Sequence, residues 1–137
     1  MYKYENCILY LLAKAHQKVY ASFKKRLQPY GLTPVQLLVL VALEKEQGVS
    51  AGELGRRLMF DNATLSGVLD RMAEGGWIIK EFSRDDKRQR LIYLTSNAKK
   101  LLRKLIQQME DANEEVLLNF GLEEKLLLKR MLRDLQH

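Results

Sequence analysis

The sequence predicts a mostly helical protein with one small β-hairpin. Apolar residues recur at steps of three and four through most of the chain, which is the spacing of one helix face. The pattern changes only between Trp77 and Leu94, where two short runs rich in aromatic and β-branched residues flank a charged stretch. At 137 residues the chain has the length of one domain with its own core. We therefore expect a single domain over residues 1–137.

The first two helices are marked by their apolar face and by their ends. A long helix is expected from about residue 5 to residue 28, followed by the breakers Pro29 and Gly31. Its apolar face comprises Ile8, Leu12, Ala15, Val19, Phe23 and Leu27. Thr33 is then predicted to be the N-cap of a second helix with Pro34 at its first position, where the missing N–H removes no hydrogen bond.

Two short helices with a tight connection follow. Ser50 begins the first of them, and Glu53 three residues later predicts a capping box. Asp61 caps the second, which stops at Gly75-Gly76. These are the proportions of a helix-turn-helix.

The hairpin comes directly after this pair of helices. Its strands are expected at residues 77–83 and 90–94, with residues 84–89 as a polar, basic tip. A hairpin in this position is a wing, so residues 33–95 are expected to form a winged helix-turn-helix.

The C-terminal part is expected to be two more helices. Thr95 or Ser96 caps the first, and the second begins at about Leu122. In the first of these helices, apolar residues alternate at steps of four and three, which is typical of a coiled-coil seam: Ala98, Leu102, Leu105, Met109, Ala112 and Val116. Residues 1–30 and 96–137 are therefore expected to be dimerisation helices that pair two copies of the chain.

The charge is unevenly placed. The net charge is +6, and the segment from Arg56 to Lys104 holds 12 basic and 6 acidic residues, whereas the rest holds 11 of each. A positive excess confined to one segment indicates a polyanionic partner.

Several other classes of protein are disfavoured. A single cysteine, Cys7, excludes an internal disulfide and argues against a zinc site made of thiolates. The only two histidines, His16 and His137, are far apart, and no glycine-rich phosphate loop is present. No apolar run has the length of a membrane span. We expect a cytoplasmic protein without catalytic residues, metal or cofactor.

Three motifs, in order along the chain, resemble one known family. They are Leu32-Thr33-Pro34-Val35-Gln36, then Leu54-Gly55-Arg56-Arg57-Leu58 with Asn62-Ala63-Thr64-Leu65-Ser66, and then Asp86-Lys87-Arg88 ahead of Leu94-Thr95. The sequence is similar to the MarR (multiple antibiotic resistance regulator) family of bacterial transcription factors, with Lys87 in place of the middle arginine of the family's wing signature. The resemblance implies a homodimer that binds double-stranded DNA. It also implies that the protein represses genes and leaves DNA when a small phenolic or lipophilic molecule or an oxidant acts on it.

Candidate DNA contacts lie at the start of the second short helix and in the wing. Short side chains at the start of a helix reach base edges in the major groove: Asn62, Ala63, Thr64, Ser66 and Gly67. Arg88, at the hairpin tip, is expected to enter a minor groove while Asp86 holds it in position. Phosphate contacts are expected from Arg84, Lys87, Arg90 and one of the pair Arg56 and Arg57. The alternative for each is an ordinary capped helix start or a solvated loop.

An effector pocket is expected between the dimerisation helices and the winged region. Its candidate lining is Tyr10, His16, Tyr20 and Phe23, although aromatic residues spaced along a helix are more often core. Cys7 does not match the cysteine of the family's peroxide-sensing branch, which falls on Leu9 in this register, so we expect a structural or interface cysteine.

Two other functions remain open. A winged helix can be an RNA-binding or protein-docking module, but that would not explain a seam suited to pairing two copies. A structural helical bundle with an incidental hairpin would leave the confined charge unexplained.

Overall fold

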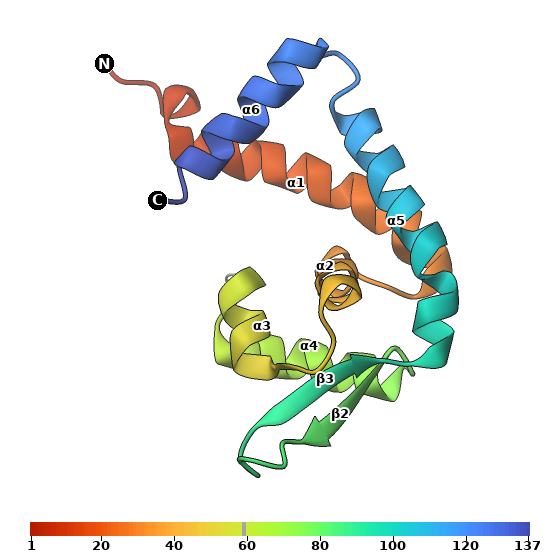
Figure 1. Cartoon of the computed structure of the whole chain (residues 1–137). Coiled ribbons are helices and arrows are strands. Elements are labelled where there is room, and N and C mark those ends of the chain that lie inside the picture. Colours follow the sequence, from red (N-terminus) through yellow and green to blue (C-terminus); the bar gives the residue numbers. More distant parts are fainter. Residues whose placement is uncertain (59) are drawn as a thin grey trace.

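The computed structural model describes residues 1–58 and 60–137. Helices make up most of the fold, and three strands form one small sheet (Figure 1). In chain order the elements are η1 (Tyr4–Asn6), α1 (Ile8–Leu27), η2 (Gln28–Tyr30), α2 (Pro34–Lys45), β1 (Val49–Ser50), α3 (Ala51–Leu58), α4 (Asn62–Glu74), β2 (Ile78–Phe82), β3 (Arg90–Leu94), α5 (Ser96–Val116) and α6 (Leu122–Asp134). In the described part of the chain, no helix has the length and hydropathy needed to cross a membrane.

The elements form two regions joined by α5. α2, α3, α4 and the sheet make the winged region, and α1, the second half of α5 and α6 form an arch beyond it (Figure 1). The two termini lie near each other at the far end of this arch (Figure 1). The fold class expected from the sequence, a mainly helical winged helix-turn-helix, is confirmed.

The predicted helix caps are present in the winged region. The Thr33 hydroxyl accepts a hydrogen bond from the Gln36 N–H (3.2 Å), and the Gln36 amide oxygen accepts one from the Thr33 N–H (3.1 Å). Thr95 caps α5 by accepting from the Ala98 N–H at 3.1 Å. Each bond satisfies an N–H that the first turn of a helix leaves unpaired.

The capping box predicted for α3 is only half formed. Ser50 Oγ accepts a hydrogen bond from the Glu53 N–H at 3.1 Å. The Glu53 carboxylate does not return to Ser50; it accepts hydrogen bonds from Arg56 and Arg57 instead. A charged partner one turn along the helix attracts the carboxylate more strongly than a neutral backbone N–H.

The sheet has a strand that the sequence analysis missed. Its order is β1-β3-β2, antiparallel throughout, with Ile78 opposite Leu94 and Val49 opposite Ile92. β1 is only two residues long, too short to show an alternating pattern, and it forms only because β3 supplies its hydrogen-bond partners. This strand ties the start of α3 to the wing.

One core fills the winged region and extends into α5. It includes Leu37, Leu40, Leu43, Leu54, Leu65, Met72 and Ile92, each at most 2% exposed. Leu102 and Leu105 of α5 belong to this same cluster. The prediction that the apolar seam of α5 pairs two copies is therefore wrong for its buried residues, which are Ala98, Leu102, Leu105 and Ala112. Sequence periodicity identifies a buried face but does not say which element covers it; here α1 and α2 do.

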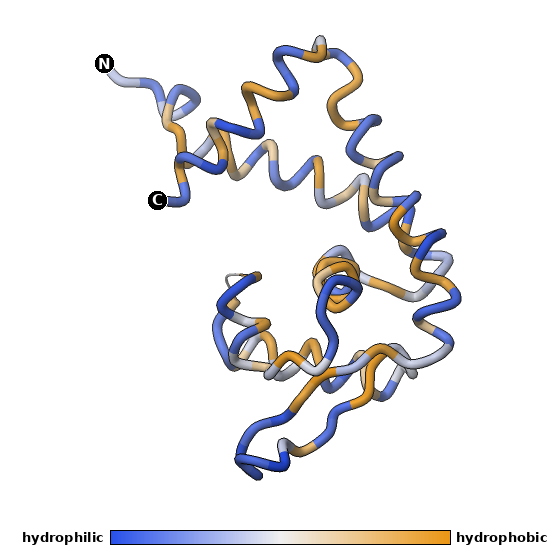
Figure 2. Tube along the Cα trace, viewed as in Figure 1, coloured by the Kyte–Doolittle hydropathy of each residue, from blue (hydrophilic) through white to orange (hydrophobic). Residues whose placement is uncertain are grey.

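The outer parts of the arch, α6 and the first half of α1, are not buried in this core. No residue of α6 is buried, although the helix carries Leu126, Leu127, Met131 and Leu132. The first half of α1 likewise exposes Ile8, Leu9, Leu11 and Leu12. Along both helices, orange segments alternate with blue ones (Figure 2).

Candidate nucleic-acid interface

The N-terminal half of α4 presents the predicted contact residues to solvent. Its apolar positions, Leu65, Val68, Leu69 and Met72, are buried in the core and fix which face points outward. The outward face carries the exposed residues Asn62, Ala63, Thr64 and Ser66, with Gly67 half-exposed beside them. All of these side chains are short, and the guanidinium of Arg71 lies against Gly67, 3.4 Å from where a Cβ would stand.

Asp61 holds the first turn of α4 and also orients Thr64. Its carboxylate accepts hydrogen bonds from the Thr64 N–H (2.8 Å) and the Thr64 hydroxyl (2.8 Å). These bonds favour the ionised form, so the pKa of the Asp61 carboxyl lies below its usual range. Since the hydroxyl hydrogen of Thr64 is already donated, its oxygen is left free to accept a hydrogen bond from a ligand.

The wing tip is an ordered turn. Ser83 Oγ accepts hydrogen bonds from the N–H groups of Asp85 (3.3 Å) and Asp86 (3.4 Å), and the Gln89 N–H donates to the Asp86 carbonyl (3.0 Å). A tip braced in this way presents its side chains in defined directions at little entropic cost.

Arg88 projects from this tip and contacts Asp86. Asp86 Oδ1 accepts from both the backbone N–H of Arg88 (3.0 Å) and its Nε (3.2 Å). The side chain of Arg88 is nevertheless 93% exposed, which leaves the terminal nitrogens of the guanidinium accessible. Arg84 and Lys87 are exposed on the same tip. The tip therefore presents exposed cationic side chains, and Asp86 orients that of Arg88.

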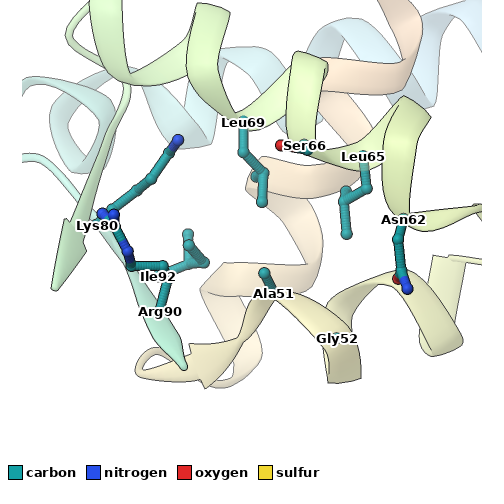
Figure 3. A pocket seen from close by; sticks show the side chains of 9 residues that line it. All are labelled: Ala51, Gly52, Asn62, Leu65, Ser66, Leu69, Lys80, Arg90 and Ile92. Atoms are coloured by element: carbon teal, nitrogen blue, oxygen red, sulfur yellow. The ribbon is translucent and has the colours of Figure 1, made fainter. Parts of the chain in front are cut away.

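A groove of about 290 Å³ separates α4 from the wing (Figure 3). Asn62 lies at one end of it, and Lys80 and Arg90 lie at the other (Figure 3). The guanidinium of Arg90, which lines the groove, stacks over the exposed Phe82 ring, 4.0 Å from its centroid. The concave surface between helix and wing is thus bordered by cations on the wing side.

The sequence analysis missed the ion pair that joins the wing to α4. Lys80 of β2 donates a hydrogen bond to Asp70 of α4, and this cation keeps the pKa of the Asp70 carboxyl below its usual range. The two residues are ten positions apart on different elements, so nothing in the sequence pairs them. Their contact adds an ionic link between β2 and α4 to the apolar packing of the core.

Arg56 and Arg57 share one acidic partner. Arg56 Nε donates to Glu53 at 3.0 Å, while Arg57 pairs with both Glu46 (2.9 Å) and Glu53 (3.2 Å). Arg56 is the more exposed of the two, at 72% of its side chain against 41%. Of the predicted pair, Arg56 is therefore the residue free to turn toward a nucleic acid, and Arg57 is the one held between two helices.

A second cavity, of about 380 Å³, lies between α1, α2 and the segment before α4. It is lined by His16, Val19, Tyr20, Phe23, Pro34, Val35, Leu37, Leu38 and Phe60. Three of the four predicted pocket residues border it. Tyr10 does not, because it lies near the start of α1 and packs edge-to-face against Tyr4 at 5.2 Å. Phe60 was missed, since only the folded chain brings it beside α1.

Cys7 lies before α1 and is partly exposed. Its carbonyl accepts the Leu11 N–H at 3.0 Å, so its backbone serves as the N-cap of the helix. Leu9, the position that matches the peroxide-sensing cysteine, is 75% exposed.

Together the two short helices, the hydrogen-bonded hairpin and its cationic tip define a winged helix-turn-helix protein. A family model described as MarR family matches residues 30–89. The organic hydroperoxide resistance transcriptional regulator of Bacillus subtilis is 30% identical over 104 residues, which cover 76% of this chain and 71% of that regulator. The chain belongs to the MarR family, whose members are transcriptional regulators and not enzymes.

Two further similarities concern length and fold. The HTH-type transcriptional regulator TtmR of Methylorubrum extorquens is 36% identical over 97 residues, which are 71% of this chain but only 48% of TtmR. The chain thus matches about half the length of that relative. The structure of Bordetella bronchiseptica BpsR, solved to explain how 6-hydroxynicotinic acid regulates its DNA binding, has a TM-score of 0.93. That match covers 99% of this chain and 97% of BpsR at 23% identity, and so it concerns the fold alone.

Proposed function

We propose that this protein is a homodimeric repressor that binds a pseudo-palindromic site in double-stranded DNA and leaves it when a small aromatic or lipophilic molecule binds. The observation that carries the proposal is the pairing of an exposed α4 face with an Arg88 braced by Asp86 on the neighbouring wing. A protein that binds chromosomal DNA in this way works in the cytoplasm.

The face of α4 is proposed to read bases in the major groove. A groove roughly 12 Å wide admits a helix whose outward side chains are short. Asn62 offers both donor and acceptor groups, and Thr64 offers an oriented acceptor because its hydrogen is donated to Asp61. Ser66 and Gly67 follow one turn after Asn62 and Ala63, and the Arg71 guanidinium lies over Gly67.

The wing is proposed to read the minor groove and the phosphates. Arg88 is a planar, permanently charged group, suited to the negative potential of a narrow minor groove. Asp86 limits the orientations of its guanidinium, so less entropy is lost when it binds. Arg84, Lys87, Arg90 and Arg56 supply charge to neighbouring phosphates.

The homodimer is proposed from the exposed apolar faces of α1 and α6. A helix with five exposed large apolar residues and no buried position gains little stability from packing against its own protomer. A second copy is the simplest cover because a two-fold axis brings the same patches together. The same axis would place two α4 helices about one helical turn of DNA apart, which requires a pseudo-palindrome with half-sites ~10 base pairs apart.

The cavity between α1 and α2 is the proposed effector site. The residues that line it, all within the described part of the chain, include neither lysine nor arginine; His16 and Tyr20 supply its polar side chains. An uncharged aromatic or lipophilic molecule therefore suits it better than a carboxylate.

Phe60 offers a route from this cavity to DNA. It borders the cavity, directly precedes the α4 cap Asp61, and donates its N–H to the Gly55 carbonyl of α3 at 3.0 Å. A ligand that displaces Phe60 would thus shift the start of α4 and weaken DNA binding.

The proposal is tested by selecting bound sites from random duplex DNA with the purified protein. A recovered pseudo-palindrome, bound more tightly than a scrambled duplex or a single-stranded RNA of the same length, is the expected result. Preference for the RNA would favour the RNA-binding alternative, and binding to neither nucleic acid would leave protein docking.

A further inference from the structure

The outward face of α5 has an unusual distribution of charge. Four cations, Lys99, Lys100, Arg103 and Lys104, occupy its first turns and all are exposed; we call them the α5 basic face. Four acids, Glu110, Asp111, Glu114 and Glu115, follow on the same helix. The positive charges are therefore at the N-terminal end, nearest the wing.

This order opposes the stability of the helix. The N-terminus of a helix carries a partial positive charge, so cations there are unfavourable. Lys99 and Arg103, like Lys100 and Lys104, are also like charges four residues apart, which repel. The first turn of α5 contains no acidic residue that offsets them.

The two ends differ in their partners. Glu115 pairs with Arg26 of α1 at 2.6 Å, and Glu114 pairs with Lys125 of α6 at 3.1 Å, so the acidic end links three helices. In the described part of the chain, no ion pair or side-chain hydrogen bond involves the four cations. Glu44 of α2 shares a groove with Lys99 and Arg103 but not with Lys100 or Lys104. Glu114 and Glu115 thus join α5 to its neighbours, whereas none of the four cations has an ionic or side-chain hydrogen-bond partner among the described residues.

The position of the α5 basic face is fixed relative to the wing. Thr95, the cap of α5, donates its hydroxyl hydrogen to the Gly76 carbonyl at 2.7 Å, and its N–H donates to the Trp77 carbonyl at 3.2 Å. α5 therefore leaves the base of the wing without an intervening loop (Figure 1). Charges on its first turns are therefore carried rigidly at the base of the wing, beyond the C-terminal end of α4.

We propose that Lys99, Lys100, Arg103 and Lys104 form a second phosphate-binding surface that contacts duplex DNA flanking the recognised site. This inference rests on the proposed DNA-binding function and extends it beyond α4 and the wing tip. A row of cations that destabilises its own helix is expected where a polyanion neutralises it. The surface lengthens the DNA that one dimer covers and adds affinity that does not depend on base sequence.

The test uses the double variant Lys100→Gln/Lys104→Gln, with Lys24→Gln/Lys25→Gln as the matched control. Each removes two exposed lysines per protomer and inserts a good helix former. The control lysines lie in the last turn of α1, where cations complement the helix dipole. Affinity is measured across a salt series on two duplexes, one limited to the selected site and one extended by about 15 base pairs on each side.

The expected result is a loss of affinity that occurs only for the α5 variant and only on the extended duplex. On the extended duplex the α5 variant binds roughly tenfold more weakly at ~0.1 M salt, and its salt slope falls by about 0.9 for each phosphate that it no longer neutralises. On the short duplex it matches wild type, and the control matches wild type on both. In urea the unfolding midpoint rises for the α5 variant, because repulsion is relieved, and falls for the control.

Other results would overturn the inference. Equal affinity and slope for wild type and the α5 variant on the extended duplex would do so, as would an equal weakening on both duplexes. A lower unfolding midpoint for the α5 variant would show that these lysines stabilise the helix. That result would contradict the premise that the cations destabilise α5. If wild type binds neither duplex, the proposed function itself fails, and that outcome is distinct from failure of the second surface alone.

Discussion

The winged region and the terminal helices differ in how far one protomer buries their apolar side chains. Among the described residues, thirteen of the nineteen buried apolar side chains of the core lie between residues 33 and 95. By contrast, fifteen of the nineteen exposed large apolar side chains lie in residues 1–12 and 118–135. The winged region is complete by itself, whereas the termini present apolar surface that the described part of the protomer leaves uncovered.

This difference separates two kinds of stability in one chain. The winged region and the first half of α5 depend on packing within the protomer, and so they respond to changes in core volume. In the proposed homodimer the start of α1 and α6 depend on a second copy, and so they respond to changes in association. Substitutions in the winged region should therefore be detected by measurements of unfolding, and substitutions in the terminal helices by measurements of association.

The largest effect is expected from Leu127→Asp combined with Met131→Asp on α6. Both side chains are about 45% exposed and lie one turn apart on one face. Two carboxylates there would prevent burial against a second copy. We expect a monomer by sedimentation at ~10 µM, and a decrease of about 10²–10⁴ in DNA affinity because the two half-sites are no longer bound together.

The control for this variant is Lys129→Asp on the opposite face of α6, which should leave the dimer intact. Circular dichroism should show the winged region still folded in the monomer. A dimer that survives the double substitution would place the interface elsewhere.

The next effect is expected in the core. Leu105 of α5 is fully buried, so Leu105→Ala should lower the free energy of unfolding by about 2–5 kcal/mol. Ile79→Ala in β2, where the side chain is 45% exposed, should cost less than about 1 kcal/mol. Urea unfolding of both variants checks the difference. A cost below ~1 kcal/mol for Leu105→Ala would mean that the α5 seam is not part of the winged core.

Local signals in the sequence predicted the winged region well. The caps at Thr33, Asp61 and Thr95 each depend on residues within one turn, so the sequence shows both partners. The contact between Asp86 and Arg88 spans two residues and was equally visible. Hydrogen bonds of this kind can be predicted because both partners lie within a few residues of each other in the sequence.

Features that join distant segments could not be predicted. β1 requires β3, the pair of Asp70 and Lys80 requires two elements at a fixed angle, and Phe60 borders a cavity only after α1 folds across it. The sequence identified the apolar face of α5 correctly but not the helices that pack against it. A 3.5-residue period fits packing against a helix of the same protomer as well as against a helix of a second copy.

A moderate effect is expected from Arg88→Ala in the wing. In the proposed complex Arg88 responds to minor-groove width and charge, so its removal should weaken binding to every site with a narrow minor groove and flatten the salt dependence by about one unit per protomer. Thr64→Ala on α4 should instead cost roughly 1–3 kcal/mol at one cognate base pair and leave non-specific binding unchanged. Both variants are compared on cognate and scrambled duplexes over a salt series. Unchanged affinity and slope for Arg88→Ala would rule out the wing as a DNA contact.

A smaller, pH-dependent effect is expected at Asp61. Its hydrogen bonds from Thr64 lower the pKa of the folded state below the unfolded value of about 3.9. The stabilisation from ionised Asp61 is therefore complete above that value and is lost as the pH falls through the folded pKa. Asp61→Asn keeps a good cap without the charge, so its unfolding midpoint should approach that of wild type as the pH falls through the folded pKa of Asp61. Thr95→Ala is the control: the Thr95 hydroxyl does not titrate, so the effect of removing it should not depend on pH in this way.

No effect on DNA binding or effector release is expected from Cys7→Ser. The backbone of Cys7, not its thiol, caps α1 through the Leu11 N–H, and serine preserves that contact. The position matching the family's sensing cysteine is Leu9, and two residues along a helix correspond to a rotation of about 200°. DNA affinity and effector release should thus match wild type, even though one relative is an organic hydroperoxide resistance regulator. The measurement is DNA binding before and after mild treatment with an organic hydroperoxide. Release of wild type but not of Cys7→Ser would show that the thiol senses oxidants and that the register comparison misassigned it.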